Sequence, residues 1–361
     1  MNKYKDLLGN KINISPEMEA RAKRAYQEIS DLLGEKLNNY DPDMFPQGSF
    51  RLGTIIKPIA GEEYDLDFVC RLNSPKDKIT PTDLKKIVGD ALKTKYSISN
   101  KTLEEMNRCW RVNLPNFHID ILPAIPESES SPFEGVESGF MEPIAIPDKE
   151  LKAWKPSNPK GYGKWFDAQA AKVERVVIAK HMVMNEADVA PLPKQNISST
   201  ILQSAIKIMK YHRDVNFKDN PDDKPISIIL TTLAARFYEG EQDLVNALQG
   251  IVNRIVIAAP SIFEANQVPN PVLPSENFAD KWKNHPERKQ AFRDWVNSLH
   301  ELTNGYFLAK GDMAKINELW GKQFKIGPEI AVLSGNSPAS ATAQPTIRLN
   351  LDNTQVKPHK W

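Results

Sequence analysis

Two aspartates, Asp65 and Asp67, stand two residues apart in the stretch YDLDFV, which covers residues 64–69. Aromatic and branched apolar residues favour a β-strand, and side chains at positions i and i+2 of a strand point to the same face, about 6.5 Å apart. Two like charges at that spacing repel each other unless something neutralises them. A divalent cation such as Mg²⁺ would do so, because it prefers carboxylate oxygens and keeps positions open for phosphates. The alternative is a solvated pair of aspartates on an exposed strand.

A third carboxylate, Asp120, lies in FHIDIL (117–122), where His118 and Asp120 share one face and the isoleucines share the other. An aspartate among such residues is costly to bury without a partner. If this strand lies beside the 63–72 strand, three carboxylates converge, and two metal ions held there could clamp an in-line phosphoryl displacement. His118 would then be a ligand, an orienting neighbour or a structural histidine.

A glycine-serine turn precedes these strands in FPQGSFRLGT (45–54). Gly48 allows the chain to bend towards a ligand without a Cβ clash, and successive backbone N–H groups in such a turn can bind a phosphate. The Ser49 hydroxyl adds a further donor. Arg51 and Lys57 either add positive charge near this turn or lie on the surface.

The elements that must position these residues fall into two groups. A helix is expected over 16–37, with Ser15 as its N-cap. Strands are expected over 54–59 and 63–72, a helix over 80–96, and a hairpin of 108–114 with 117–124 around Pro115-Asn116. Ile144 to Ile146 could add a short strand. This order predicts an α+β layer with a mixed or antiparallel sheet.

From about residue 165 the apolar spacing becomes helical. Helices are expected over 165–185, 198–214, 226–239, 241–258, 286–308 and 312–321. Residues 334–346 are small, polar and proline-containing, which predicts a flexible linker. The last stretch is expected to be an edge strand or disordered.

Composition excludes some classes of protein. The net charge of +1 argues against a protein that coats long nucleic acid. The sequence contains no run of 18 or more apolar residues, so no membrane span is expected. The start MNKYKDLLGN lacks the apolar region of an export signal, so we expect a cytoplasmic protein. The two cysteines, Cys70 and Cys109, have no metal-ligand spacing and are expected to be reduced structural thiols.

The order Gln47-Gly48-Ser49, Gly53-Thr54, Asp65-Leu66-Asp67 and Asp120 resembles the DNA polymerase β-like nucleotidyltransferase superfamily. Within it, QGSFRLGT is similar to the CD-NTases, bacterial relatives of the animal cyclic-GMP-AMP synthase and oligoadenylate synthase. The segments 153–166, 206–214, 225–233 and 270–282 are also similar, so the resemblance covers about residues 15 to 325.

This resemblance implies a two-lobed polymerase-β-like fold: a mixed-sheet catalytic lobe with an N-terminal spine helix (1–165), a helical nucleotide-binding lobe (166–330) and a flexible tail (331–361). It implies that Gln47, Gly48 and Ser49 hold the donor triphosphate. It also implies that Asp65, Asp67 and Asp120 are catalytic and hold two Mg²⁺ ions, which Mn²⁺ can replace, with Asp120 helping to take the proton.

On the helical lobe, the resemblance points to Lys210 and Ser227 as further triphosphate-binding residues. Lys207 is the competing choice for that lysine. From the residues alone, Lys210 would be a solvated charge and Ser227 a helix cap. Tyr162, Trp165 and Tyr211 would either stack on a base or belong to the core.

The activity implied is synthesis of a cyclic di- or trinucleotide from ATP, GTP, CTP or UTP, with release of pyrophosphate, as a second messenger in bacterial anti-phage defence. Proteins of the same defence operon would be its regulators, and we expect a monomer that needs neither membrane nor extended nucleic acid. The rival interpretations are an enzyme that makes linear oligonucleotides or tails RNA or protein, and a catalytically silent nucleotide-binding scaffold. The bases joined, the linkage, the ring size and the activator stay open. The final Lys360-Trp361 either argues against covalent attachment of the C-terminus to a target or indicates a shortened C-terminus.

Overall fold

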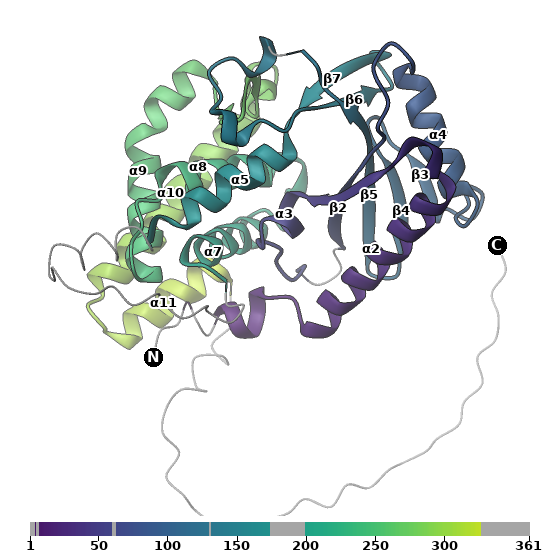
Figure 1. Ribbon diagram of the computed structural model, residues 1–361. Helices are drawn as coiled ribbons and strands as arrows, with labels where there is room; N and C mark the ends of the chain where they lie inside the picture. The colour runs from purple at the N-terminus through teal and green to yellow at the C-terminus, as the bar shows by residue number, and fades with distance from the viewer. Residues whose placement is uncertain (1–3, 5–6, 60–62, 130, 174–198, 326–361) are drawn as a thin grey trace, which may run out of the picture. The chain divides into compact units, whose positions relative to one another are not determined.

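The computed structural model describes the chain except for residues 1–3, 5–6, 60–62, 130, 174–198 and 326–361 (Figure 1). The described residues belong to one compact unit, Met1–Lys325. The expected linker over 334–346, the final stretch and the expected tail over 331–361 lie outside the described residues. So does the second half of the helix expected over 165–185.

A seven-stranded mixed sheet forms the first part of the unit. Its central strands, β2 (Tyr64–Arg71) and β5 (Phe117–Pro126), run parallel, while the other pairs in this sheet are antiparallel. The order is β1-β2-β5-β4-β3, and β6 and β7 continue from β5. The remaining bounds are β1 Asp43–Gln47, β3 Leu103–Glu105, β4 Trp110–Leu114, β6 Ile144–Asp148 and β7 Ala153–Ser157. The expected α+β layer with a mixed sheet is confirmed.

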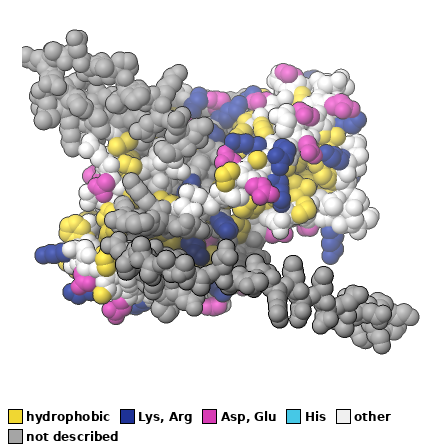
Figure 2. Space-filling view, turned by 90° about the horizontal axis from the view of Figure 1, so that it is seen from below, with side chains coloured by type: hydrophobic (Ala, Val, Ile, Leu, Met, Phe, Trp, Pro, Cys, Tyr) yellow, Lys and Arg dark blue, Asp and Glu magenta, His cyan; other side chains and the backbone are white. Residues whose placement is uncertain are grey.

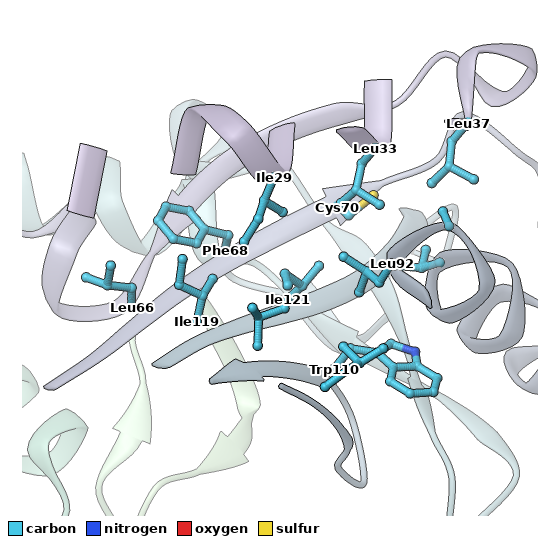
Figure 3. Close-up of a cluster of buried hydrophobic side chains, with 14 of the residues drawn as sticks. Ile29, Leu33, Leu37, Leu66, Phe68, Cys70, Leu92, Trp110, Ile119 and Ile121 are labelled. Atoms are coloured by element: carbon cyan, nitrogen blue, oxygen red, sulfur yellow. The ribbon is translucent and has the colours of Figure 1, made fainter. Parts of the chain in front are cut away.

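One face of this sheet is covered by α2 (Pro16–Lys36) and α4 (Pro81–Lys93) (Figure 1). Ser15 Oγ accepts from the Met18 N–H at the start of α2, as the sequence predicts. Figure 3 shows the core beneath α2, built from alternate residues of the strands. Its labelled members are Ile29, Leu33, Leu37, Leu66, Phe68, Cys70, Leu92, Trp110, Ile119 and Ile121. Because these side chains occupy one face, Asp65, Asp67 and Asp120 must point to the other.

Helices make up most of the rest of the described chain (Figure 1). They are α5 (Pro159–Ala170), α7 (Ile201–Asn216), α8 (Ser227–Phe237), α9 (Leu244–Ala265), α10 (Pro286–Leu308) and α11 (Met313–Phe324). Short helical turns η5 (Pro221–Asp223) and η6 (Asp280–Lys283) and the hairpin of β8 (Pro269–Asn270) with β9 (Leu273–Asn277) connect them. The bounds of α10 are those predicted from the sequence. The ends of α7, α8 and α11 lie within three residues of the predicted ends, and α9 extends about two turns further than predicted.

The N-terminal segment contacts both parts. The ring of Tyr4 packs, tilted, against Tyr306 of α10 and Trp320 of α11. The carbonyl of Ile12, in η1 (Leu8–Ile12), accepts from the Lys57 N–H at 2.6 Å. With α2 packed on the sheet, this segment fits the expected spine.

One expectation about the first part is wrong. Residues 54–59 form no strand: Ile55 is buried in the core without sheet pairing, and the Thr54 carbonyl accepts from Lys210. Strand β1, which pairs with β2, was not predicted. The short strands β3 and β7 were likewise not predicted.

Within the described residues, α9 is the one helix that is long and apolar enough to cross a membrane by length and composition alone. It packs against α7, α8 and α10, and a core helix passes the same test. Cys70 and Cys109 are both free thiols.

Candidate active site

The strand register brings the three predicted carboxylates to one face of the sheet. Asp67 of β2 is the direct partner of Asp120 of β5, and Asp65 is the partner of His118. On the other side of β5, Arg111 of β4 is the partner of Asp120. The adjacency of the two aspartate strands, a condition of the sequence prediction, is therefore confirmed.

Asp67 is the least compensated of the three. Within the described part of the chain it makes no hydrogen bond or ion pair. Burial, together with the charges of Asp120 and Asp65, raises the pKa of Asp67 to about 6. A carboxylate in this position is stabilised by any cation that enters the site.

Asp120 and Asp65 each have a basic neighbour. The Asp120 carboxylate accepts from Arg111 Nε at 2.7 Å and from Arg111 Nη2 at 2.8 Å, a two-pronged ion pair. His118 Nε2 lies 2.7 Å from Asp65 Oδ1. Burial by itself would raise the pKa of Asp65, but the contact with His118 and the charge of Arg111 outweigh it and lower the pKa. Contact with Asp65 in turn raises the pKa of His118.

The glycine-serine turn lies directly beside Asp67, because the last residue of β1, Gln47, pairs with Asp67. Gly48 has a φ of +57°, and a Cβ on it would collide with Asp67 Oδ2. Ser49 follows in the short helix α3 (Gly48–Arg51), where its carbonyl accepts from the Thr54 N–H at 2.9 Å. Glycine is thus required both for the bend and for the close approach of the carboxylate.

A cavity of about 720 Å³ joins the turn and the carboxylates to the helices. Six predicted site residues line it: Gly48, Ser49, Asp65, Asp67, Lys210 and Ser227. Gln47, Asp120 and Lys207 are not among the lining residues. The volume suits a small-molecule ligand.

Of the two candidate lysines, the structure places Lys210 at the cavity. Its Nζ donates to the Thr54 carbonyl at 3.1 Å, and burial together with the charge of Arg213 lowers the pKa of Lys210 to about 7. Lys207 instead donates to Asn13 Oδ1 at 3.1 Å and to Ser199 Oγ at 2.9 Å. The helical register that the sequence alone left open is set by these contacts.

Ser227 is the first residue of α8, and its side chain does not cap the helix. Its Oγ accepts from Arg213 Nη1 at 2.8 Å. Arg213 and its neighbour Asp214 also line the cavity and were not predicted. They lie one turn after Lys210 on α7, so helical spacing from that lysine was the signal that could have found them.

Arg111 was missed as well, although a signal was present. In a hairpin with the two-residue turn Pro115-Asn116, residues whose numbers lie equally far from the turn face each other. This rule places Arg111 opposite Asp120, as the structure shows.

Other candidates lie away from the cavity. Arg51 pairs with Asp167 at 2.6 Å. Tyr162 is buried and hydrogen-bonded to Thr232 Oγ1 at 2.8 Å, and Trp165 is buried beside it. The ring of Tyr211 packs against that of Phe324. These three aromatics are packing residues here, which is the second of the two roles considered for them.

The comparisons with known proteins agree with this geometry. Residues 1–170 match the family described as the Second Messenger Oligonucleotide or Dinucleotide Synthetase domain. A c-di-GMP synthase of Roseivirga ehrenbergii is 32% identical over 287 residues, which cover 78% of this chain and 73% of that protein.

Solved structures share the fold. The Bradyrhizobium diazoefficiens CD-NTase CdnG in complex with GTP has a TM-score of 0.64 at 20% identity and covers 87% of this chain and 92% of its own. The Vibrio cholerae cyclic AMP-GMP synthase DncV, bound to the linear intermediate 5′ pppA(3′,5′)pG, has a TM-score of 0.59 at 17% identity and covers 90% of this chain and 94% of its own. The two-part, polymerase-β-like fold is thereby confirmed. The chain belongs to the CD-NTase family, the nucleotidyltransferases that synthesise cyclic oligonucleotides.

Proposed function

We propose that this enzyme joins two nucleoside triphosphates, at least one of them GTP, into a cyclic dinucleotide with release of pyrophosphate. The observation that carries this proposal is that the glycine-serine turn, two aspartates, Lys210 and Ser227 all line one cavity. GTP is favoured because the 32% identical relative is a c-di-GMP synthase and a structural neighbour is solved with GTP.

In this proposal the triphosphate of the donor nucleotide is held from two sides. Gly48 and Ser49 supply donors from the sheet side, and Lys210 and Ser227 supply them from the helices. Phosphate oxygens would take the place of the Thr54 carbonyl as the partner of Lys210, and their negative charge would restore the protonated ammonium group. Such transfers depend mainly on positioning and charge neutralisation. The division into a catalytic lobe (1–165) and a helical lobe (166–330) is kept as part of this proposal.

The arrangement of the candidate site residues provides part of a binding site for a divalent metal ion. Asp65 and Asp67 offer hard oxygen ligands, and the electrostatic strain on Asp67 favours a cation. However, among the described residues no group of three or more His, Cys, Asp or Glu side chains is arranged to hold a metal. In this arrangement Arg111 engages both Asp120 oxygens.

We therefore infer that Asp120 joins Asp65 and Asp67 when Arg111 releases at least one of its oxygens. Two Mg²⁺ or Mn²⁺ ions held by the three aspartates would neutralise the phosphates and polarise the attacking ribose hydroxyl. The same release would leave an Asp120 oxygen free to take the proton of that hydroxyl. After the first bond forms, the linear product turns round and a second attack closes the ring.

The test is to incubate the full chain with all four nucleoside triphosphates and Mg²⁺ or Mn²⁺, treat with phosphatase and identify the products by mass spectrometry. We expect a phosphatase-resistant cyclic dinucleotide that contains guanosine. A phosphatase-sensitive linear product, a labelled macromolecule or a ring without guanosine would each contradict the proposal. Nucleotide binding without pyrophosphate release at any metal concentration would favour a silent scaffold instead.

From the family resemblance we further propose that the product is a second messenger of bacterial anti-phage defence, made in the cytoplasm and controlled by proteins of the same operon. The near-neutral charge and the mixture of basic and acidic side chains on the described part of the face in Figure 2 support a small substrate over extended nucleic acid. Phage challenge of cells that carry the operon with and without an intact Asp67 would test the role in defence.

A further inference from the structure

Arg213 is a buried arginine whose contacts the reaction described above does not use. It is 6% exposed and lies on α7, one turn after Lys210. Its Nε and Nη2 donate to Asp214 Oδ1 at 2.8 and 2.7 Å. Its Nη1 donates to the Pro225 carbonyl at 3.0 Å and to Ser227 Oγ at 2.8 Å. The guanidinium therefore connects α7 to the loop before α8 and to the first residue of α8.

The direction of the bond to Ser227 has a chemical consequence. A guanidinium has only N–H donors, whereas a serine hydroxyl has one O–H donor and two acceptor lone pairs. Ser227 Oγ must therefore accept from Arg213. The Ser227 proton is then left for a different acceptor. Within the described residues, no other hydrogen bond involves this hydroxyl.

An anion in the cavity would supply that acceptor. Ser227 lines the cavity together with Lys210 and Ser49, and α8 begins there with its N-terminal, partially positive end. A phosphate oxygen is an acceptor without protons at neutral pH, so it suits an O–H whose orientation is already fixed. Orientation before binding reduces the entropy lost on binding.

We propose that Arg213 is a positioning residue, which acts through Ser227 by holding its oxygen so that its proton points to the triphosphate. This rests on the proposed function, because it takes the cavity ligand to be a nucleoside triphosphate. Arg213 does not serve as the phosphate ligand itself. Its contacts engage four of its five N–H groups, and Asp214 offsets its charge.

A double-mutant cycle separates this role from a purely structural one. The ligand is a GTP analogue with a methylene group in place of the α–β bridging oxygen, and its Kd is measured by calorimetry with Mg²⁺. The variants of the full chain are Ser227→Ala, Arg213→Lys and the double variant. Lysine keeps the charge but cannot reach all three partners of the guanidinium at once. The matched control is Arg236→Lys, because Arg236 donates to the Pro269 carbonyl at 2.9 Å and does not line the cavity.

We expect each single variant to raise Kd about tenfold, the double variant to raise it by the same tenfold, and the control to leave it unchanged. A double variant that is about a hundredfold weaker, or an Arg213→Lys variant that binds like the wild type, would overturn the proposal. If Arg213→Lys lacks a cooperative melting transition, Asp214→Asn replaces it, since it loosens the guanidinium without removing it. Asp214→Asn is then combined with Ser227→Ala in the same double-mutant cycle, and the same two outcomes apply.

The wild-type protein separates this proposal from the proposed function. If the wild type neither binds the analogue nor turns over nucleoside triphosphates, the proposed function itself fails. If the wild type does both and the cycle is additive, only the role of Arg213 fails.

Discussion

The three aspartates on the open face of the sheet differ in what neutralises them. Asp65 has His118, Asp120 has Arg111, and Asp67 makes no hydrogen bond or ion pair with a cationic group among the described residues. Asp67 also lies between the other two carboxylates and next to Gly48. Repulsion from these neighbours makes the Asp67 carboxylate costly to stability. This cost supports the proposed cation site, because stability is often sacrificed locally at functional sites.

Replacing Asp67 with Asn should therefore abolish product formation, by at least about a thousandfold, without unfolding the protein. Removal of the charge relieves the repulsion from Asp65 and Asp120, so the melting temperature without added metal should be at least that of the wild type. Product is measured by mass spectrometry and melting by calorimetry. Near-normal product, or a large drop in melting temperature, would contradict this account of Asp67.

Arg111 is expected to compete with metal ions for Asp120. Replacing Arg111 with Met removes a positive charge and frees both carboxylate oxygens, so the nucleotide-free protein should bind Mn²⁺ several-fold more tightly. Electron paramagnetic resonance measures free Mn²⁺ directly and does not depend on turnover. The matched control is Arg108→Met, which breaks a comparable ion pair with Asp148 (3.1 Å) outside the cavity. Equal Mn²⁺ affinity in the wild type and in Arg111→Met would count against the competition.

At the scale of the elements, the sequence predicts what depends on local periodicity. The helix over 16–37 and the hairpin around Pro115-Asn116 form as expected because caps, apolar spacing and turn residues specify them. The strand expected over 54–59 failed because an apolar run reports burial but not the partner that buries it. β1 was not predicted because this short edge strand contains Pro46 and has polar residues at both ends, so it lacks the apolar pattern typical of a strand.

Gly48, in the turn after β1, must satisfy two constraints: a positive φ and the close approach of Asp67. The substitution Gly48→Ala tests both. The side chain would be strained at a φ of +57° and would displace Asp67. We expect a loss of roughly 1–3 kcal/mol in the free energy of unfolding and more than tenfold weaker binding of the GTP analogue. Gly135→Ala is the control, because Gly135 also has a positive φ (+82°) but a Cβ there meets nothing within 4 Å. Equal effects of the two substitutions on binding would show that the approach to Asp67 is unimportant.

At the scale of the whole molecule, the cavity arises where strands and helices meet, and this could not be predicted from the sequence. Two strands separated by about 50 residues must align so that Asp67 faces Asp120, and α7 must rotate so that Lys210, not Lys207, reaches Thr54. Both depend on long-range packing, on which local patterns carry no information. The types of the candidate site residues were predictable from their spacing and resemblance, and helical spacing could have added Arg213 and Asp214. The contacts of Arg213 with Asp214, Pro225 and Ser227 were not predictable, because they depend on how α7 packs against the start of α8.

Lys210 connects the two parts, and its burial predicts a conflict between stability and function. A lysine whose folded pKa is lowered from 10.5 to about 7 binds its proton more weakly in the folded state than in the unfolded state. The cost is therefore fully present below pH 7, shrinks as the pH rises from 7 to 10.5, and is absent above that range. The charges that face it are Arg213, Asp214, Asp67 and Lys207, and of these the arginine contributes most.

Replacing Lys210 with Met should accordingly raise the free energy of unfolding by on the order of 2 kcal/mol at pH 6.5 and by less at pH 9.5. The same change should weaken binding of the GTP analogue at least tenfold, because it removes a cation from the triphosphate. Lys207→Met is the matched control: burial also lowers the pKa of Lys207, but this lysine does not line the cavity. It should leave nucleotide binding unchanged. Denaturant unfolding at both pH values and calorimetric titration measure the two effects. Two outcomes would contradict the proposal that Lys210 is a buried lysine that binds the triphosphate. One is that Lys210→Met destabilises the protein at pH 6.5, and the other is that both lysine substitutions affect binding equally.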